Sequence, residues 1–251
     1  MNGNICRKTI FKATGIAIFA VLFYTSCDDN GVKVVTPEVT TFEDVRDGKV
    51  YKKVKIGSQI WMAENLRYEA DGSVCYEDSA PVLRDSAGVV KLVTQEEHCD
   101  YYGRLYDWNT AMDGVGSSHA NPSGVEGVCP VGWHIPSDAE WTELQDFVGL
   151  NVGTKLKSRE WHDMFTTGGK PAQDGTDKYR FSALPGGMGS QQNGRSSFGG
   201  VRSNGYWWSS TERAGNDHEA WIRHITGTQE GVWRQSFDKH QWFLSVRCVH
   251  D

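Results

Sequence analysis

The sequence is poor in proline, in excess positive charge and in long apolar runs. It has 7 proline residues in 251, and its composition excludes collagen, coiled coil and low-complexity disorder. Lys and Arg number 26 against 32 Asp and Glu. A net charge of −6 does not suit phosphate neutralisation, so we expect no nucleic-acid partner. The chain has instead 28 Gly and 10 Trp, which predict short strands and many turns around an aromatic core.

Motifs for catalysis and for metal binding are also missing. The sequence has no Gly-x-Ser-x-Gly elbow, no Cys-x-x-Cys pair and no His at zinc spacing from a cysteine. The glycine-rich stretch 186–205 lacks the Gly-Lys-Ser/Thr ending of a phosphate loop, so we interpret it as turns and close backbone approaches. His134 is interpreted as a hydrogen-bonded core histidine. Residues 216–219 offer oxygen ligands for Ca²⁺, but an exposed polar loop is the preferred interpretation. We expect no cofactor, no metal and no enzymatic activity.

The longest apolar run lies near the N-terminus and is short. Residues 13–24 span roughly 18 Å as a helix, less than the ~30 Å of a bilayer core, and Arg7, Lys8 and Lys12 precede them. This pattern predicts a secretory signal peptide over residues 1–26. The sequence Tyr-Thr-Ser-Cys at 24–27 resembles a bacterial lipobox, although Tyr24 stands where leucine is usual. The resemblance implies that Cys27 becomes the lipidated N-terminus; an ordinary signal peptide cleaved nearby is the alternative.

Residues 27–45, which follow the signal peptide, predict a flexible tether and the cellular location of the protein. Residues 27–45 are largely polar and cannot bury enough apolar area to fold alone, so we expect a flexible tether. Asp28-Asp29-Asn30 resembles the surface-export signals of Bacteroidota lipoproteins, whereas in enterobacteria an aspartate at this position retains a lipoprotein in the inner membrane. We therefore expect a membrane-anchored lipoprotein at the outer membrane, exposed on the cell surface, and leave the leaflet open.

Four cysteines remain after the signal peptide and Cys27: Cys75, Cys99, Cys129 and Cys248. An even number in an exported chain indicates two disulfides, with three connectivities open. We favour Cys75–Cys99 as a local clip and Cys129–Cys248 as a link from mid-domain to the last strand. The chain-entropy model assigns them roughly 3 and 5 kcal/mol.

Hydrophobic periodicity predicts one α+β domain over residues 46–251. The clearest helix is 137–148, where Ser137 and Glu140 form a capping box and Gly149 follows the last turn. A weaker helix is predicted over 104–112. Trp207 and Trp208 alternate on a strand, so we expect one to point inward and the other outward. Strands are predicted over 49–56, 59–63, 179–184, 206–211, 219–226, 231–237 and 242–249.

Six motifs in a fixed order resemble the Fibrobacter succinogenes major paralogous domain family over about residues 46–251. They are IGSQIWMAENL (56–66), YGRLYDW (102–108), CPVGWHIPSDAEW (129–141), FSALPGG (181–187), YWWSST (206–211) and SVRCV (245–249). The resemblance implies a disulfide-stapled C-type-lectin-like fold, close to that of formylglycine-generating enzymes, with two helices, a twisted antiparallel sheet and long loops. The family's usual cysteine pairing agrees with the favoured one. The loop from Cys75 to Cys99 is longer than usual, and residues 82–93 predict a small hairpin.

The resemblance leaves the activity open. A formylglycine-generating, sulfatase-modifying-factor-like oxidase needs a late cysteine pair, and here Cys248 stands alone. The Glu-Pro-Asn, Gln-Pro-Asp and Trp-Asn-Asp motifs of calcium-dependent lectins are absent. We therefore expect a non-enzymatic binding or adhesion module for an extracellular glycan or protein. A receptor diversified by a retroelement is a further alternative.

A ligand face is predicted on the late loops. Mixtures of Arg, Tyr and small amides suit adaptable recognition, and the corresponding loops of C-type-lectin-like proteins bind ligands. Ordinary solvated loops are the alternative interpretation of the same residues. The candidate ligand-binding residues are Arg202, Asn204, Tyr206, Arg213, Asp217, His218, Arg234 and Lys239.

Overall fold

The protein is described by a computed structural model. The structure describes residues 36–76, 94–159, 161, 175–192 and 195–251, and the backbone alone of 26–27, 33–34, 82–84 and 90–92. The chain divides into two compact units, Met1–Thr36 and Pro37–Asp251. In the first unit, β1 (Ser26–Cys27) pairs with β2 (Lys33–Val34) in an antiparallel arrangement. The rest of the predicted signal peptide lies outside the described residues.

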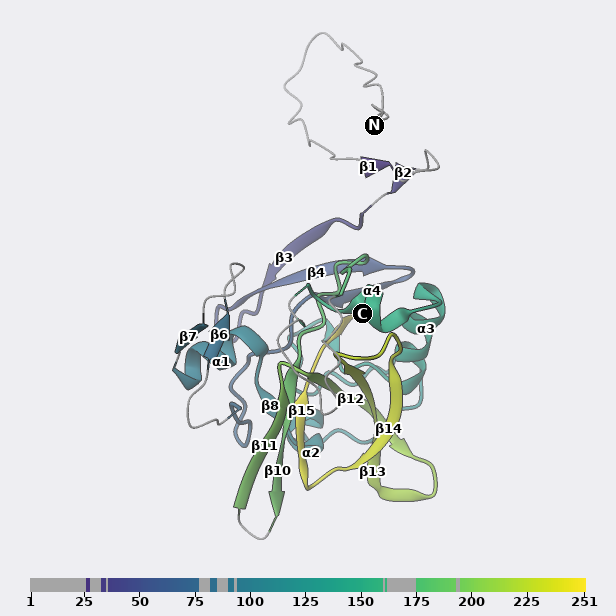
Figure 1. The fold of residues 1–251 in the computed structure, drawn as a ribbon. Coiled ribbons are helices and arrows are strands. Elements are labelled where there is room, and N and C mark those ends of the chain that lie inside the picture. The colour runs from purple at the N-terminus through teal and green to yellow at the C-terminus, as the bar shows by residue number, and fades with distance from the viewer. Residues whose placement is uncertain are drawn as a thin grey trace. The chain divides into compact units, whose positions relative to one another are not determined.

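The fold is rich in β-structure, which corrects the expectation of a C-type-lectin-like α+β fold with two helices. Strands make up 38% of the described residues and helices 16%, and these residues form two multi-strand sheets and four helices (Figure 1). The glycine-rich stretch that we interpreted as turns contributes two strands. At Gly187, where φ is 69°, a Cβ would lie 2.6 Å from the Gly199 carbonyl oxygen. Glycine therefore allows these strands to pair closely, although its strand propensity is low.

The larger sheet has seven strands and contains most of the C-terminal half. Its order is β11-β10-β15-β12-β13-β14, and β8 pairs with β15. The strand β12 is central: it runs antiparallel to β13 and parallel to β15, with Trp207 opposite Ser245. The strands are β8 (Leu105–Tyr106), β10 (Gly186–Gln192), β11 (Arg195–Val201), β12 (Asn204–Arg213), β13 (Asn216–Thr226), β14 (Trp233–Asp238) and β15 (Trp242–Ser245).

The smaller sheet joins the start of the domain to its end. Its order is β3-β4-β5-β16-β9, and all of its neighbouring strands are antiparallel. Its first strand lies within the segment 27–45 for which the sequence predicts a tether, so the ordered domain includes residues before 46. The strands are β3 (Val39–Glu43), β4 (Val50–Ile56), β5 (Gln59–Met62), β9 (Trp133–His134) and β16 (Val249–His250).

Three of the four described helices begin at a residue whose side chain caps the first turn. Helix α3 (Asp138–Val148) confirms the strongest helix prediction, because Ser137 and Glu140 form the capping box and Gly149 is the C-cap. Helix α1 (Gln95–Tyr102) has a second capping box, from Thr94 and Glu97, which the sequence analysis missed. The other two helices are α2 (Trp108–Met112) and α4 (Val152–Leu156). No helix in the described part of the chain is long and apolar enough to cross a membrane.

Two of the predicted elements are wrong or shifted. The helix expected over 104–112 begins only at Trp108, because Leu105 and Tyr106 pair with β15 and Asp107 is the N-cap. The strand expected over 179–184 is absent: Arg180 and Ser182 have positive φ, a left-handed conformation that interrupts an extended strand.

The strand β12 is buried on both of its faces. Trp207 packs with Trp61 and Trp141 in one apolar cluster, and Trp208 packs with Tyr106 in another. Both indoles are buried, with exposures of 1% and 0%, so the expectation that one points outward is wrong. A central strand covered on both sides keeps the alternation of its side chains but buries both sets.

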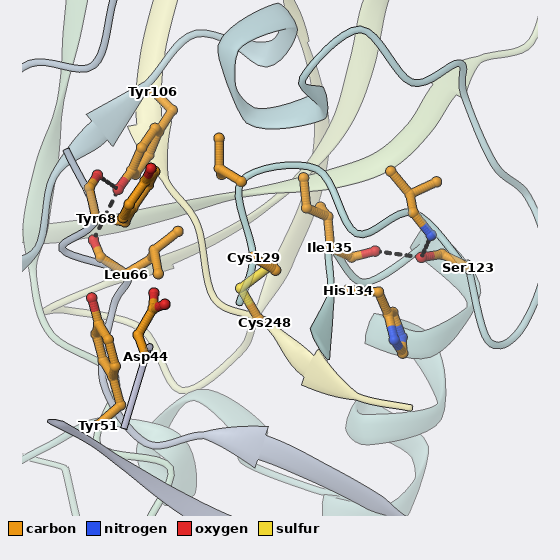
Figure 2. Close-up of a disulfide and its surroundings, with 12 residues drawn as sticks. Asp44, Tyr51, Leu66, Tyr68, Tyr106, Ser123, Cys129, His134, Ile135 and Cys248 are labelled. Atoms are coloured by element: carbon orange, nitrogen blue, oxygen red, sulfur yellow. Dashed lines mark hydrogen bonds between the residues drawn. A yellow bond between two sulfur atoms is a disulfide. The ribbon is translucent and has the colours of Figure 1, made fainter. Parts of the chain in front are cut away.

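Both favoured disulfides are present. Cys75 is bonded to Cys99 in α1, and Cys129 is bonded to Cys248 just before β16. Figure 2 shows the second bond beside Ile135 and His134. The small hairpin predicted over 82–93 is confirmed, because β6 (Val82–Arg84) pairs with β7 (Val90–Leu92) in an antiparallel arrangement.

Candidate functional site

A polar pocket of about 400 Å³ lies where α1, the end of β5 and the loop 177–184 meet. We call it the Arg180 pocket. Ala63 and Leu184 form part of its wall, together with Tyr101, Ser158 and Ser182. Three cationic and three anionic side chains line it: Lys52, Glu64, Asp100, Arg159, Asp177 and Arg180. Because side chains of both signs line one hollow, the pocket suits a polar ligand rather than an apolar one.

The loop at this pocket has a strained backbone. Asp177, Arg180 and Ser182 have φ values of 45°, 57° and 50°, in the left-handed region that non-glycine residues rarely adopt. They are three of the six such residues in the described part of the chain, and all three line the pocket. Each such residue costs on the order of 1 kcal/mol or more and persists only where its surroundings hold it.

A buried arginine in the core binds the backbone of the loop 177–184. Arg247 is fully buried and donates to the carbonyl oxygens of Phe181 and Ser182. It also donates to Asn65 Oδ1, at 2.7 Å from Nη2 and 3.1 Å from Nε. Burial lowers the pKa of Arg247 to about 9, so the guanidinium stays charged at neutral pH. It forms no direct ion pair among the described residues, and the two carboxylates whose charge favours its charged form, Glu64 and Asp177, both line the pocket.

Contacts within the loop complete its shape. Asp177 accepts hydrogen bonds from the Ser182 backbone nitrogen at 2.8 Å and from the Ser182 hydroxyl at 2.9 Å. Ser158 donates its backbone N–H to the Ala183 carbonyl at 3.0 Å. Across the pocket, Glu64 accepts from the backbone N–H of Lys52 at 2.7 Å, and their side chains form an ion pair at 3.6 Å. These contacts engage the Asp177 and Glu64 carboxylates within the fold.

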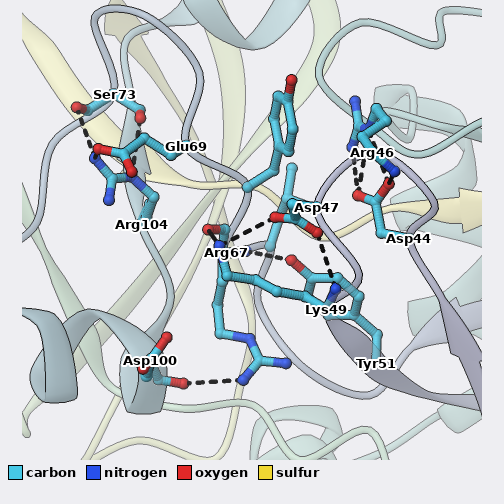
Figure 3. A network of polar contacts seen from close by, with 12 residues as sticks. Asp44, Arg46, Asp47, Lys49, Tyr51, Arg67, Glu69, Ser73, Asp100 and Arg104 are labelled. Carbon is cyan, nitrogen blue, oxygen red and sulfur yellow. Dashed lines mark hydrogen bonds and ion pairs between the residues drawn. The ribbon is translucent and has the colours of Figure 1, made fainter.

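Helix α1 brings Asp100 and Tyr101 to the opposite wall. The Cys75–Cys99 disulfide fixes the helix one residue before Asp100. Arg67 donates to the Asp100 carbonyl oxygen at 3.5 Å (Figure 3). It also donates to the Val50 carbonyl at 2.7 Å. Asn65 Nδ2 donates to the Tyr102 carbonyl at 2.7 Å, so the same asparagine supports both walls of the pocket.

Three polar groups on the pocket lack partners among the described residues. The Ser158 hydroxyl is buried, with the residue 7% exposed, and makes no hydrogen bond. In the part of the chain that the structure describes, neither the Asp100 carboxylate nor the Arg180 guanidinium forms an ion pair or hydrogen bond. A buried hydroxyl without a partner is uncommon, because it loses its water without compensation.

The residues predicted for the ligand face do not converge on one place. Arg202 and Asn204 lie at the start of β12, whereas Arg213, Asp217 and His218 lie at its far end, about ten residues and roughly 33 Å along the strand. At that far end, Arg213 and Asp217 line a smaller hollow of about 300 Å³. Arg213 also pairs with Glu219 at 2.7 Å.

The remaining three predicted residues have partners within the fold. Tyr206 is buried and stacks on His224, with ring centroids 4.4 Å apart. Lys239 is also buried, forms an ion pair with Glu212 and lies over the Trp108 ring. Arg234 pairs with Asp138 at 2.9 Å and covers the Trp221 ring at 3.2 Å.

His134 has the geometry expected of a structural residue. Its Nε2 lies 2.6 Å from Glu140 and its Nδ1 2.6 Å from Asp251. Burial disfavours the charged ring, but the bonds to Glu140 and Asp251 outweigh burial and raise the pKa of His134. The interpretation as a hydrogen-bonded core histidine is confirmed. The described residues contain no group of three or more His, Cys, Asp or Glu placed to hold a metal ion.

None of the residues that line the Arg180 pocket is among the ligand-binding residues predicted from the sequence. The Thr94-x-x-Glu97 capping box was a usable signal for α1 and hence for Asp100. Nothing in the periodicity indicates that Arg180 and Ser182 leave the extended conformation.

Comparison with known proteins finds one family. The model described as the Fibrobacter succinogenes major domain matches residues 54–250, which is more than half of the chain. No curated protein and no solved structure matches.

Proposed function

The chain belongs to the Fibrobacter succinogenes major domain family, and from that premise we propose that it is a non-enzymatic binding module for an extracellular ligand, a glycan or a protein. The family description names a domain and no reaction. The proposal therefore depends on the residues of this chain and on how they are arranged.

The observation that carries the proposal is the Arg180 pocket. It is lined by the exposed side chains of Asp100 and Arg180, which have no partner among the described residues, and by Ser158, whose buried hydroxyl has none either. The walls that hold them are fixed by the Cys75–Cys99 disulfide and by the Asn65–Arg247 contacts. A backbone that is fixed before binding loses little conformational entropy when a ligand arrives, which favours recognition.

The cysteine chemistry supports binding over catalysis. Cys248 is bonded to Cys129, and Cys75 to Cys99, so all four cysteines of the domain are in disulfides. A thiol-dependent oxidation of the formylglycine-generating kind has no free thiol to use in this arrangement.

We propose that the module is anchored by lipid at Cys27 and displayed at the outer membrane. The support is the short apolar run, the lipobox-like residues 24–27 and the polar segment after them. A lipid-anchored domain at a cell surface meets soluble and surface-bound ligands directly, which suits an adhesion or capture role.

The test uses the full chain with Cys27→Ala. This substitution removes the proposed lipid attachment site, so that the secreted protein is soluble. A glycan array and a pull-down of surface proteins are run with and without Ca²⁺. We expect a ligand whose binding weakens at least tenfold in Arg180→Gln. The matched control is Arg195→Gln, because Arg195 is an exposed arginine on β11.

Two results would count against this assignment. Binding that depends on Arg213 but not on Arg180 would move the site to the smaller hollow at the β12–β13 turn. Absence of any glycan or protein ligand in both assays would overturn the binding function itself.

A further inference from the structure

We propose that the Arg180 pocket binds an acidic sugar, with the sugar carboxylate on Arg180 and neighbouring hydroxyls on Asp100 and Ser158. This inference rests on the proposed binding function and specifies its ligand class. Its basis is the set of groups that the fold leaves without partners at the pocket.

The anionic group of the ligand is inferred from Arg180, because the fold leaves its guanidinium without a carboxylate partner among the described residues. Asp177 accepts two hydrogen bonds from Ser182, and Glu64 forms an ion pair with Lys52, so both carboxylates are engaged within the fold. Arg180 has no partner among the described residues, and the buried Arg247 behind the loop is held only by oxygen atoms of carbonyl and amide groups. Arg180 is therefore the guanidinium at the pocket that lacks a carboxylate partner among the described residues, and a guanidinium pairs best with a planar carboxylate.

The hydroxyl groups of the ligand are inferred from Asp100 and Ser158. An ionised carboxylate accepts hydrogen bonds only, so the ligand group facing Asp100 must be a donor. The Ser158 hydroxyl can donate and accept, and it is buried without a partner, so a ligand hydroxyl would satisfy it. Two neighbouring sugar hydroxyls can donate to Asp100 and pair with the Ser158 hydroxyl. They do so without the cost of desolvating a second charged group on the ligand.

The same groups disfavour other anions. A phosphate carries more charge than a carboxylate, and it would face Asp100 and Asp177 on the pocket wall. A peptide end offers a cation for Asp100 and an anion for Arg180, but it brings no hydroxyl pair for Ser158. The partly buried Tyr101 and the apolar Ala63 and Leu184 provide a surface for the carbon face of a sugar ring.

The experiment measures binding of acidic glycans by the full chain carrying Cys27→Ala. The probes are a galacturonic-acid trisaccharide, its methyl ester, and an array of glycans ending in glucuronic, mannuronic or sialic acid. We expect binding confined to carboxylate-bearing glycans, at least tenfold weaker for the corresponding ester, and at least tenfold weaker in Arg180→Gln. Arg195→Gln should bind as the parent does.

A second variant separates ligand binding from folding. Ser158→Ala removes a buried hydroxyl that has no partner in the fold, so its melting temperature should equal or exceed that of the parent. Its affinity for the acidic glycan should nevertheless fall at least fivefold. A merely structural role for Ser158 predicts unchanged affinity.

The outcomes distinguish this inference from the proposed function. Binding that survives esterification, or that is unchanged in both Arg180→Gln and Ser158→Ala, overturns the acidic-sugar assignment. So does the absence of any bound acidic glycan. Arg180-dependent binding of a neutral glycan or a peptide also overturns it, yet leaves the module's binding function standing.

Discussion

Asn65 and Arg247, 182 residues apart, are joined by two hydrogen bonds to one amide oxygen inside the core. The same Oδ1 accepts from Trp207 Nε1 at 2.8 Å, and the amide nitrogen donates to the Tyr102 carbonyl. One asparagine thus links β12, the C-terminal segment and α1. Because Arg247 in turn holds the carbonyls of Phe181 and Ser182, this contact connects the core to the pocket loop.

Replacing Asn65 by Ala should lower the free energy of unfolding by about 3–5 kcal/mol. The substitution leaves the Arg247 charge and the Trp207 N–H buried with fewer acceptors. Urea denaturation followed by tryptophan fluorescence measures the change. Lys178→Ala, at an exposed residue, is the control and should shift stability by less than about 0.5 kcal/mol. A loss under about 1 kcal/mol for Asn65→Ala would mean that water replaces the amide.

The Cys129–Cys248 bond should stabilise the domain more than Cys75–Cys99. It closes a separation of 119 residues against 24, so the chain-entropy model assigns it roughly 5 against 3 kcal/mol. Paired Cys→Ala double variants of each bond, compared by thermal denaturation, measure the difference. Peptide mapping without reductant checks the pairing. A free Cys248 would contradict it and reopen thiol chemistry.

The side chains of Trp207 and Trp208 should be equally important to stability. Both are buried, on opposite faces of β12, and each indole N–H donates a hydrogen bond at 2.8 Å. Truncation of either to Ala should cost about 3–5 kcal/mol. Denaturant midpoints of the two variants are compared with that of Trp233→Ala, whose parent side chain is half exposed. A small loss in one member of the pair would mean that one face of the strand is open.

Stability should fall as the pH drops from about 6.5 to about 4 because of His224. Burial lowers the pKa of His224 to about 4, and neither ring nitrogen has a hydrogen-bond partner among the described residues. In that window the unfolded state binds a proton that the folded state does not, which costs on the order of 3 kcal/mol by the low-pH end.

His224→Phe should keep the stack on Tyr206 and flatten this part of the stability–pH curve. His134→Gln serves as the comparison, since the pKa of His134 is raised and its contribution to stability is present at low pH and lost as the pH rises. Chemical denaturation at pH 4.5, 6 and 8 separates the two residues. An unchanged slope in His224→Phe would assign the acid sensitivity to other groups.

Cys27→Ala should release the protein from membranes. Acyl chains on the N-terminal cysteine would supply nearly all of its affinity for the bilayer. Membrane fractionation of cells expressing the parent and the variant measures the shift. Mass spectrometry of the mature parent protein gives the independent check: an unmodified N-terminus downstream of residue 27 would exclude the anchor.

Local features of the fold were predictable where local chemistry decides them. Helix α3 follows from Ser137, Glu140 and Gly149, which satisfy its end groups within one turn of the chain. The strand β4 follows from its apolar alternation. The motif order also identified the family, because each motif is read along the chain without knowledge of its neighbours in space.

The sheets were less predictable because strand pairing is not local. The stretch 186–201 looks like turns by propensity, yet β10 and β11 form there because glycine permits a close approach between strands. The burial of both Trp207 and Trp208 depends on what covers each face of β12. The residues that pack on the two faces come from β5, α2 and α3, which lie far from β12 in the sequence.

By itself the sequence determined the caps of α3, the family, the cysteines available for pairing and the absence of known catalytic motifs. Only the tertiary structure decided the β-rich architecture and the location of the pocket. Its walls come from β4, α1, the end of α4 and the loop 177–184. No local pattern encodes that meeting, because Arg247 and Asn65 impose the left-handed turns at Arg180 and Ser182 from positions more than sixty residues away.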